Sequence, residues 1–447
     1  MVKSEIQRHP NEKWHPVLRL VADVKPEEVR PALILTFNFF LLFTAYYVLK
    51  PIREGLILSM NGGAELKSSA TAVQALLFIL LVPLYSRLAD RFSGRGILAA
   101  IYLFMAANIL ILMTLGLMTF TYLGVVYFIW IGFFNMLTIS QTWSLCNDIF
   151  SPEAGKRVFA LIGFGAAAGA ALGSMVLRSA VPVFGLYKPM IIAAALLTIC
   201  AALVWFGVPA RPPLGKRRES IASDSSRDLL GGLTMVFRNR YVMLVATLIF
   251  LTNLINTNSE YMLGRLVADH FGALIPEGPI RQAALRTAIG EFYASFFFWV
   301  NIVVVVAQGV AVSRIIKHLG VKRALFIMPI LALFSYLSVL FLPLLAVVRL
   351  VKITENSTDY SLNNTVREIL YLPLTTDEKY KAKLAADTIF RRIGDALSKP
   401  IVFVVVEVLG IGISGFSGVN LLLVLIWFWL VWKIGVKRGK MMRLEPK

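Results

Sequence analysis

The amino-acid sequence contains apolar runs of about twenty residues that recur along its whole length, and each run is long enough to cross a bilayer core as an α-helix. Of the 447 residues, 57% are hydrophobic and only 16% are charged. Soluble domains carry about 45–50% apolar and roughly 25% charged residues. The runs are continuous rather than alternating in polarity, which argues against a transmembrane β-barrel. The sequence therefore predicts an all-α membrane protein.

The apolar runs predict twelve membrane-spanning helices, of which the fourth, tenth and eleventh are unusually polar. The predicted spans cover residues 31–58, 68–88, 96–118, 121–150, 157–182, 187–208, 241–267, 288–315, 323–343, 344–373, 384–410 and 416–435.

A change of composition divides the spans into two halves. From Pro209 to Gly232 the chain is first proline-rich, then basic, then serine-rich, which is typical of a linker. We predict two pseudo-symmetric six-helix bundles, joined by a cytoplasmic linker and flanked by cytoplasmic segments. The boundaries are 1–30 for the N-terminal segment, 31–208 for the first bundle, 209–240 for the linker, 241–435 for the second bundle and 436–447 for the basic tail.

The charges indicate how the chain is oriented. There are 45 Lys and Arg residues against 26 Asp and Glu residues, a net charge of +19. The basic residues gather in alternate short loops, as the positive-inside rule requires of cytoplasmic loops. We therefore expect both termini in the cytoplasm and no interaction with nucleic acid.

A repeated segment supports an internal duplication. Ser86–Leu98 and Ser313–Leu325 each follow the second span of their half, begin with Ser-Arg and end on Leu. Two six-span halves with this loop resemble the major facilitator superfamily, whose signature between spans 2 and 3 is matched by Asp90, Arg91 and Arg95. The resemblance implies that these charges hold neighbouring helix ends together and act as a gate. The alternative is that they only set membrane topology.

The first span contains three ionisable residues, Lys50, Arg53 and Glu54. A charge inside a span costs about 2.5–3.5 kcal/mol on insertion scales, so it indicates a function by default. Lys50 and Glu54 are four residues apart and can pair on one helix face. At least one cation remains in surplus and could hold an anion in a central cavity. The alternative is that the cations extend to the outer membrane surface.

Spans 4 and 5 carry two further patterns. Span 4 ends with polar residues that include Asn147 and Asp148. Span 5 has glycines at positions 165, 169 and 173, two consecutive small-xxx-small steps that allow another helix backbone to approach closely. We interpret the glycines as a packing face.

Polar residues also concentrate in spans 7, 10 and 11. No helix facing lipid would carry the charged face of span 10, so that face lines a wet cavity or is buried in protein. The first turns of span 11 are expected at the cytoplasmic mouth, where they form a gate or only solvent-screened ion pairs. A re-entrant segment that does not cross the membrane is the alternative for span 10. The candidate residues are Asn256 and Glu260 in span 7, Lys352, Glu355, Asp359, Asn364 and Arg367 in span 10, and Arg391 and Asp395 at the start of span 11.

The sequence shows no glycine-rich phosphate loop, no metal-ligand cluster and no pairing of a nucleophile with a base. We therefore expect no enzymatic activity, no metal ion and no cofactor. Cys146 and Cys200 lie within apolar runs and are interpreted as core residues.

Four segments resemble the ATP/ADP translocase (TLC) family of nucleotide antiporters. They are Tyr47 to Glu54 with Gly62 to Glu65, Trp143 to Asp148 with Ser151 to Arg157 and Leu161 to Gly165, Gly290 to Phe292, and Ser357 to Leu374 with Lys381 to Asp387. The resemblance implies a divergent bacterial-type member that exchanges ATP for ADP, or moves a related phosphorylated anion, in the bacterial cytoplasmic membrane.

The sequence departs from the family at three positions. Asp359 and Asp395 stand where the family has lysine, and Ile131 stands where it has an acidic residue. Each lysine-to-aspartate exchange changes the local charge by two units and disfavours a di- or triphosphate. A proton-coupled carrier of a smaller or less anionic metabolite is therefore the alternative function.

We predict a secondary transporter that works by alternating access around a site at the middle of the membrane. Its solute is a small anion, its surroundings are the lipid bilayer, and it functions as a monomer. The predicted solute-binding residues are Lys50, Arg53, Asn147, Asn256, Asn364 and Arg367. Glu54, Asp148, Glu260, Lys352, Glu355 and Asp359 are predicted to form charge pairs or to couple charge to movement, and Asp90, Arg91, Arg95, Arg391 and Asp395 to form gates.

Overall fold

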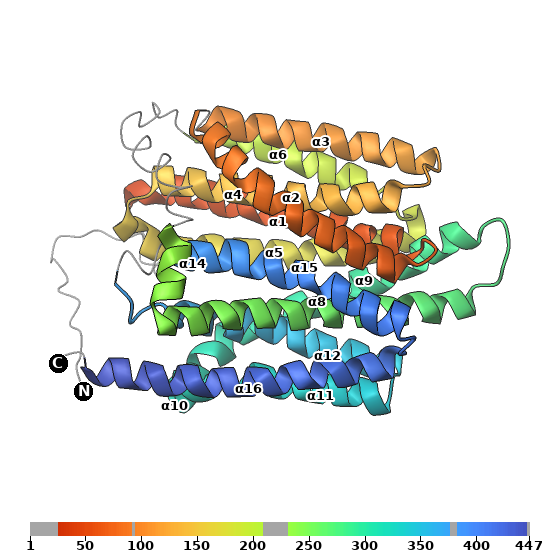
Figure 1. The fold of residues 1–447 in the computed structure, drawn as a ribbon. Coiled ribbons are helices and arrows are strands. Elements are labelled where there is room, and N and C mark those ends of the chain that lie inside the picture. Colours follow the sequence, from red (N-terminus) through yellow and green to blue (C-terminus); the bar gives the residue numbers. More distant parts are fainter. Residues whose placement is uncertain (1–25, 92–93, 209–230, 376–381, 445–447) are drawn as a thin grey trace.

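The structure is a computed structural model that describes residues 26–91, 94–208, 231–375 and 382–444. Within these ranges every regular element is a helix, and the long helices run side by side (Figure 1). The predicted all-α fold class is confirmed.

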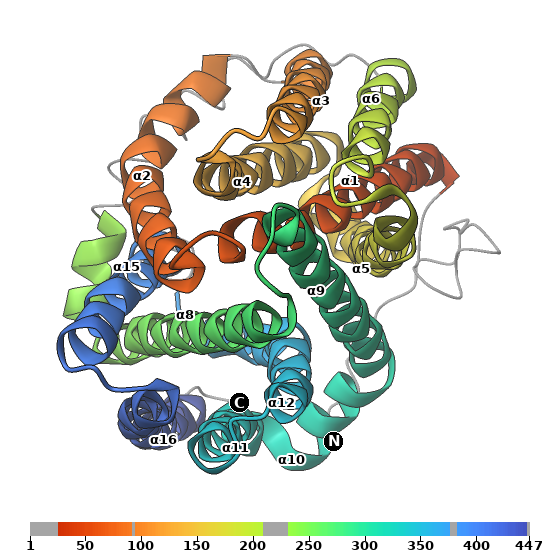
Figure 2. The ribbon, with the colours of Figure 1, turned by 90° about the vertical axis from the view of Figure 1, so that its right-hand side faces the viewer.

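The first half contains one helix for each predicted span. Seen along the helix axes, its six helices form one group and the later helices form a second group (Figure 2). The helices of the first half are α1 (Pro26–Leu58), α2 (Gly63–Arg91), α3 (Arg95–Leu117), α4 (Leu123–Ile149), α5 (Pro152–Phe184) and α6 (Met190–Gly207).

The second half also follows the predicted spans, but three of these spans contain π-helical segments. The helix predicted as span 10 runs without a break from Leu345 to Leu370, so it is not a re-entrant hairpin. The elements are α8 (Arg240–Leu274), α9 (Arg281–Val306), η2 (Ala307–Ala311), α10 (Val312–Ala324), α11 (Ile327–Phe341), α12 (Leu345–Thr358), η3 (Asp359–Asn363), α13 (Asn364–Leu370), α14 (Lys383–Ala385), η5 (Ala386–Phe390), α15 (Arg391–Val402), η6 (Phe403–Val408) and α16 (Ile413–Leu444).

Among the described residues, 8 helices are long and apolar enough to cross a membrane by length and composition alone. The other predicted spans fall on α2, α11, α12 to α13, and α14 to η6. α11 is short, and the remaining three carry charged residues within their length. A charged helix is stable at membrane depth when it is buried in protein or lines a cavity. The three charged spans therefore depend on tertiary packing.

The glycines of α5 bring this helix into backbone contact with α1. A Cβ atom added to Gly169 would lie 2.1 Å from the carbonyl oxygen of Phe40, and one added to Gly173 would lie 2.3 Å from that of Thr44. The Thr44 hydroxyl also donates a hydrogen bond to the Gly169 carbonyl at 3.2 Å. The predicted packing face of span 5 is confirmed, and its partner is the charged helix α1.

The two halves contact each other along α1, α2, α5, α8, α9 and α15. On α9, the Asn301 amide donates hydrogen bonds to the Ala170 carbonyl and the Ser174 hydroxyl of α5, each at 3.2 Å. Gly55 of α1 lies against α9 so closely that a Cβ there would be 3.2 Å from the Cα of Gly290. α1 is therefore held between its own half and the other.

Two ends of the molecule are distinguished below. The linker end is where α1 begins and where α6 and α16 end, and the opposite end carries the connections from α1 to α2 and from α8 to α9 (Figure 1).

We predict that Gly169→Leu destabilises the protein by roughly 1–3 kcal/mol or more, because the new side chain would collide with the α1 backbone. The measurement is the thermal unfolding temperature of purified protein in detergent. Gly163→Leu is the matched control, since it lies on the same helix with open space around it. Equal unfolding temperatures for the two variants would contradict the prediction.

Candidate functional site

A cavity of about 250 Å³ lies between the two halves. Five of its lining residues were predicted as site residues: Lys50, Arg53, Asn256, Glu260 and Asp395. The others are Tyr46, Lys67, Thr71, Gln74, Phe128, Thr257, Phe297 and Tyr360. We call this the central cavity.

Lys50 is enclosed by aromatic rings. Its ammonium nitrogen lies 4.0 Å from the ring centroid of Phe297, 5.1 Å from that of Tyr47 and 5.8 Å from that of Tyr360. The residue is 9% exposed, and α1 continues beyond it to Leu58. Lys50 therefore does not extend to the membrane surface. Cation–π contacts of this kind contribute about 2 kcal/mol when desolvated, and they leave the positive charge available to an anion.

The predicted pairing of Lys50 with Glu54 is wrong. Glu54, only 1% exposed, instead forms ion pairs with its neighbour Arg53 and with Lys67 of α2, the latter at 2.8 Å. The Arg53 guanidinium also lies 4.7 Å from the ring centroid of Phe128. Two cations therefore converge on one buried carboxylate, and this leaves Lys50 without a carboxylate partner within 4.0 Å among the described residues.

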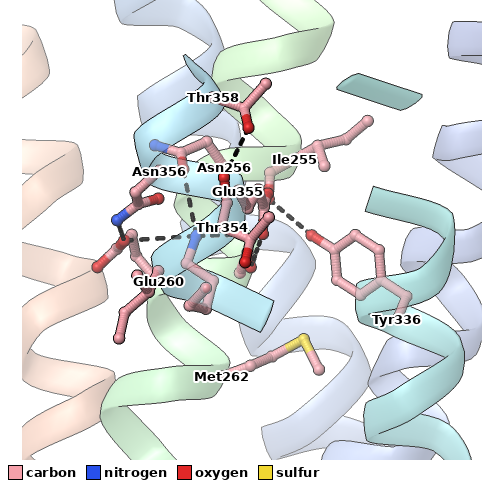
Figure 3. A network of polar contacts seen from close by, with 12 residues as sticks. Ile255, Asn256, Glu260, Met262, Tyr336, Thr354, Glu355, Asn356 and Thr358 are labelled. Atoms are coloured by element: carbon pink, nitrogen blue, oxygen red, sulfur yellow. Dashed lines mark hydrogen bonds and ion pairs between the residues drawn. The ribbon is translucent and has the colours of Figure 1, made fainter. Parts of the chain in front are cut away.

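Glu260 of α8 continues the chain of charges into the second half. Its carboxylate lies 3.8 Å from the Lys67 ammonium and 3.4 Å from that of Lys352, and it accepts a hydrogen bond from the Asn356 amide at 3.2 Å. Figure 3 shows Glu260 and Asn356 facing each other, with Asn256 and Glu355 close by. Glu260 is therefore the carboxylate that joins the cations of both halves.

The last carboxylate of the network is Glu355. It forms an ion pair with Lys352 at 3.5 Å and accepts a hydrogen bond from the Ser259 hydroxyl at 3.4 Å. Lys352 and Glu355 are 1% and 3% exposed, so both charges are buried. The charge pairing predicted for span 10 is present.

The signs of these groups leave one positive charge in excess. Three cations, Arg53, Lys67 and Lys352, alternate with three carboxylates, Glu54, Glu260 and Glu355. Lys50 is additional to this balanced set. The arrangement can therefore attract an anion without the cost of several uncompensated buried cations.

Asp395 closes the cavity from the side of α15. Its carboxylate forms an ion pair with Arg392 at 3.5 Å and accepts a hydrogen bond from the Thr257 hydroxyl at 3.0 Å. The Arg392 guanidinium lies 4.6 Å from the ring centroid of Phe78 on α2, a contact between the halves. Arg391, the cation predicted as a gate, is not the one that pairs with Asp395.

Other predicted residues lie away from the central cavity. Asn147 is exposed on α4, Asn364 is exposed and Arg367 is partly exposed on α13, and none of the three is among the described lining residues. Asp359 accepts a hydrogen bond from the Asn363 amide at 2.6 Å within η3, and Asp148 is partly buried near the end of α4.

Of the three residues predicted to form the loop gate, the structure describes the side chain of Arg95. Its guanidinium donates a hydrogen bond to the Val208 carbonyl at 2.7 Å and lies 5.6 Å from the ring centroid of Trp205. A cation at the carbonyl end of α6 is favoured by the helix dipole. Arg95 thus ties α3 to α6 within one half, while the side chains of Asp90 and Arg91 lie outside the described residues.

Sequence reasoning missed Lys67, which belongs to both the cavity and the ion network. The predicted second span begins at residue 68, so Lys67 was assigned to a loop. In the structure α2 already begins at Gly63. The signal that could have found it is Glu65, because an acidic residue is favoured in the first turn of a helix.

These features define a membrane transporter: a helical bundle in two halves with a charged cavity between them. The chain belongs to the Major Facilitator Superfamily, whose family model matches residues 33–354. The model of the TLC ATP/ADP transporter family matches residues 333–438, which contain the segment from Ser357 to Asp387. The resemblance predicted from that segment is confirmed over this C-terminal part.

Solved structures of other transporters share the fold. The nucleoside transporter NupG is 14% identical, with a TM-score of 0.60 over 94% of this chain and 100% of that chain. A bacterial homologue of the human lysosomal transporter Spinster is 10% identical, with a TM-score of 0.59 over 93% and 98%. A POT family transporter in complex with 5-aminolevulinic acid is 13% identical, with a TM-score of 0.59 over 91% and 96%. Comparison with curated proteins gave no match.

We predict that Lys352→Met lowers the stability of the protein by about 3–5 kcal/mol, because it leaves the buried carboxylate of Glu355 without a cation and the half-buried Glu260 with Lys67 alone. The thermal unfolding temperature measures the effect, and Lys433→Met on α16 is the control outside the network. Adding Glu355→Gln to Lys352→Met should restore part of the loss. Unfolding of the single variant at the temperature of the unmodified protein would contradict the role of Lys352.

Proposed function

We propose that this transporter exchanges anionic solutes of the nucleotide class, ATP for ADP or a related phosphorylated anion, by alternating access. The observation that carries the proposal is the convergence of Lys50, Arg53 and Lys67 on one cavity between the halves. The match of residues 333–438 to the ATP/ADP transporter model supports the solute class.

The lining residues suggest how such a solute is held. Lys50 and Arg53 attract the phosphate groups, and the amide of Asn256 hydrogen-bonds to polar groups of the solute. The rings of Phe128, Phe297 and Tyr360 offer flat apolar surfaces for a base, since aromatic rings prefer stacked or edge contacts. Asn147, Asn364 and Arg367 lie nearer the linker end. They contact the solute as it passes between that end and the central cavity.

The charges provide the link to movement. Glu260 and Asp359 couple the charge of the bound solute to the rocking of one half against the other around the central cavity. The transporter works as a monomer in the bacterial cytoplasmic membrane, with the linker end facing the cytoplasm.

A second function is favoured by the charge balance. Only Lys50 is in excess over the paired network, and the central cavity of about 250 Å³ is smaller than the roughly 300–1,000 Å³ of common ligand pockets. Both features suit a smaller or less anionic metabolite. Glu260 and Asp359 then serve as protonation sites of a proton-coupled carrier.

The test is uptake of labelled ATP into proteoliposomes of purified protein, either preloaded with ADP or empty. Uptake that requires internal ADP is the expected result of exchange. Uptake that is independent of internal ADP and follows an imposed pH gradient would favour the proton-coupled carrier. Absence of ATP uptake from monodisperse protein would contradict nucleotide exchange.

We predict that Lys50→Gln lowers exchange by about tenfold to a hundredfold, because a hydrogen bond to a charged group contributes roughly 1.5–3 kcal/mol. Arg53→Ala should also abolish most uptake. The matched control is Lys433→Gln, because Lys433 likewise lies over a ring, that of Trp429 at 3.9 Å, but on α16 outside the cavity. An equal effect of the two lysine variants would contradict the role of Lys50.

A further inference from the structure

Two ion pairs join α2 of the first half to α8 of the second near the opposite end. Lys67 lies 3.8 Å from Glu260, and Glu65 forms an ion pair with Arg265 and accepts a hydrogen bond from the Tyr261 hydroxyl at 2.9 Å. The polarity of the two pairs is reversed, since α2 supplies the cation to one and the carboxylate to the other. We call these four charged residues the α2–α8 clasp.

The clasp lies between two cavities. Lys67 and Glu260 line the central cavity, whereas Glu65 and Arg265 line a second cavity of about 790 Å³ at the opposite end. That cavity is formed by the connection from α1 to α2 and the connection from α8 to α9, so its walls also come from both halves. Separation of α2 from α8 would therefore join the two cavities.

The ion pair nearer the central cavity, Lys67 with Glu260, is the inner pair. It can break without leaving an unpaired buried charge. When Lys67 leaves Glu260 it keeps Glu54 at 2.8 Å, which lies in its own half. Glu260 in turn keeps Lys352 at 3.4 Å and the Asn356 amide at 3.2 Å, both in the second half. Breaking a buried ion pair is costly chiefly because one charge is left uncompensated. In this network the ion pair between the halves, Lys67 with Glu260, can break at low cost because each residue keeps a partner in its own half.

The outer pair, Glu65 with Arg265, is more exposed to solvent than the inner pair. The Arg265 and Glu65 side chains are 39% and 20% exposed, so solvent screens their attraction. They line the second cavity and are not among the described residues of the central cavity. A solute in the central cavity would therefore act on Lys67 before it acts on the outer pair.

We propose that Lys67 is a coupling residue: an anionic group of the solute takes the place of Glu260 beside Lys67 and so releases α2 from α8 at the opposite end. Without solute the clasp holds that end closed, so a carrier that has released its solute at the linker end does not open the opposite end while empty. Net uptake from the opposite side therefore requires a second anion on the return step. The inference rests on the proposed function only in requiring that the solute be anionic.

The first test uses distances and needs no solute. Spin labels are placed at Asn61→Cys on the α1–α2 connection and Ile280→Cys on the α8–α9 connection, with Cys146→Ala and Cys200→Ala removing the native thiols. Glu260→Gln should raise the solute-free population of longer label-to-label distances at least threefold. The matched control is Glu407→Gln, because the pair of Glu407 with Lys399 at 2.7 Å stays within the second half. Equal distance distributions for the two variants, both in this protein and in the Arg265→Gln background described next, would overturn the proposal.

Two further measurements keep this test decisive. If the outer pair masks the effect, the comparison in an Arg265→Gln background should reveal it, and no difference there either would overturn the proposal. If Glu260→Gln does not fold, Lys67→Met removes the same contact from the first half and should give the same opening.

Measurements with ADP and ATP distinguish failure of the clasp proposal from failure of the proposal that the solute is a nucleotide. ADP should increase the longer distances in the protein that retains Glu260 and have little further effect in Glu260→Gln, which should also take up ATP into empty vesicles. Opening in Glu260→Gln, together with no response to ADP in the protein that retains Glu260, would support the clasp and contradict the nucleotide as solute. A strict requirement for internal ADP in Glu260→Gln would contradict the clasp as the cause of exchange.

Discussion

Compensation of buried charge is the constraint on which the structure depends. An ion taken out of water costs several kcal/mol even after relaxation, and only close partners of opposite sign offset that cost. The alternating series from Arg53 through Glu54, Lys67, Glu260 and Lys352 to Glu355 meets this requirement across four helices and both halves. The arrangement of α1, α2, α8 and α12 around the central cavity follows from the need to bring these groups together.

Apolar packing places the charged segment of α1 where it is needed. Gly165, Gly169 and Gly173 of α5 allow the α1 backbone to approach closely, and Gly55 allows the same contact with α9. Because membrane helices gain little from burying apolar surface against one another, such close approaches and interhelical hydrogen bonds supply much of their association energy. The charged residues thus lie on a helix that small residues fix on both sides.

The excess of one cation connects the network to transport. A cavity that is electrically balanced except for Lys50 attracts an anion, yet each charge that the solute displaces retains a partner in its own half. A transporter must bind its solute and also release it, so strong uncompensated charge would work against turnover. The aromatic rings around Lys50 stabilise its charge when no solute is present.

The twelve-span helical fold, the glycine face of span 5 and five of the residues that line the central cavity could be predicted from the amino-acid sequence. These features could be predicted because a polar or charged residue inside a membrane span is costly and therefore indicates a buried or functional position. The spacing of small residues along a helix also identifies a packing face. Which charged residues form ion pairs could be seen only once the helices were placed in three dimensions. Glu54 pairs with Lys67 of α2 rather than with Lys50 four residues away, Asp395 pairs with Arg392, and Asn147, Asn364 and Arg367 lie outside the cavity. Ion pairing depends on distances between helices that are remote in sequence. Because the predicted second span begins about one turn later than α2 does, Lys67 fell outside the predicted helix.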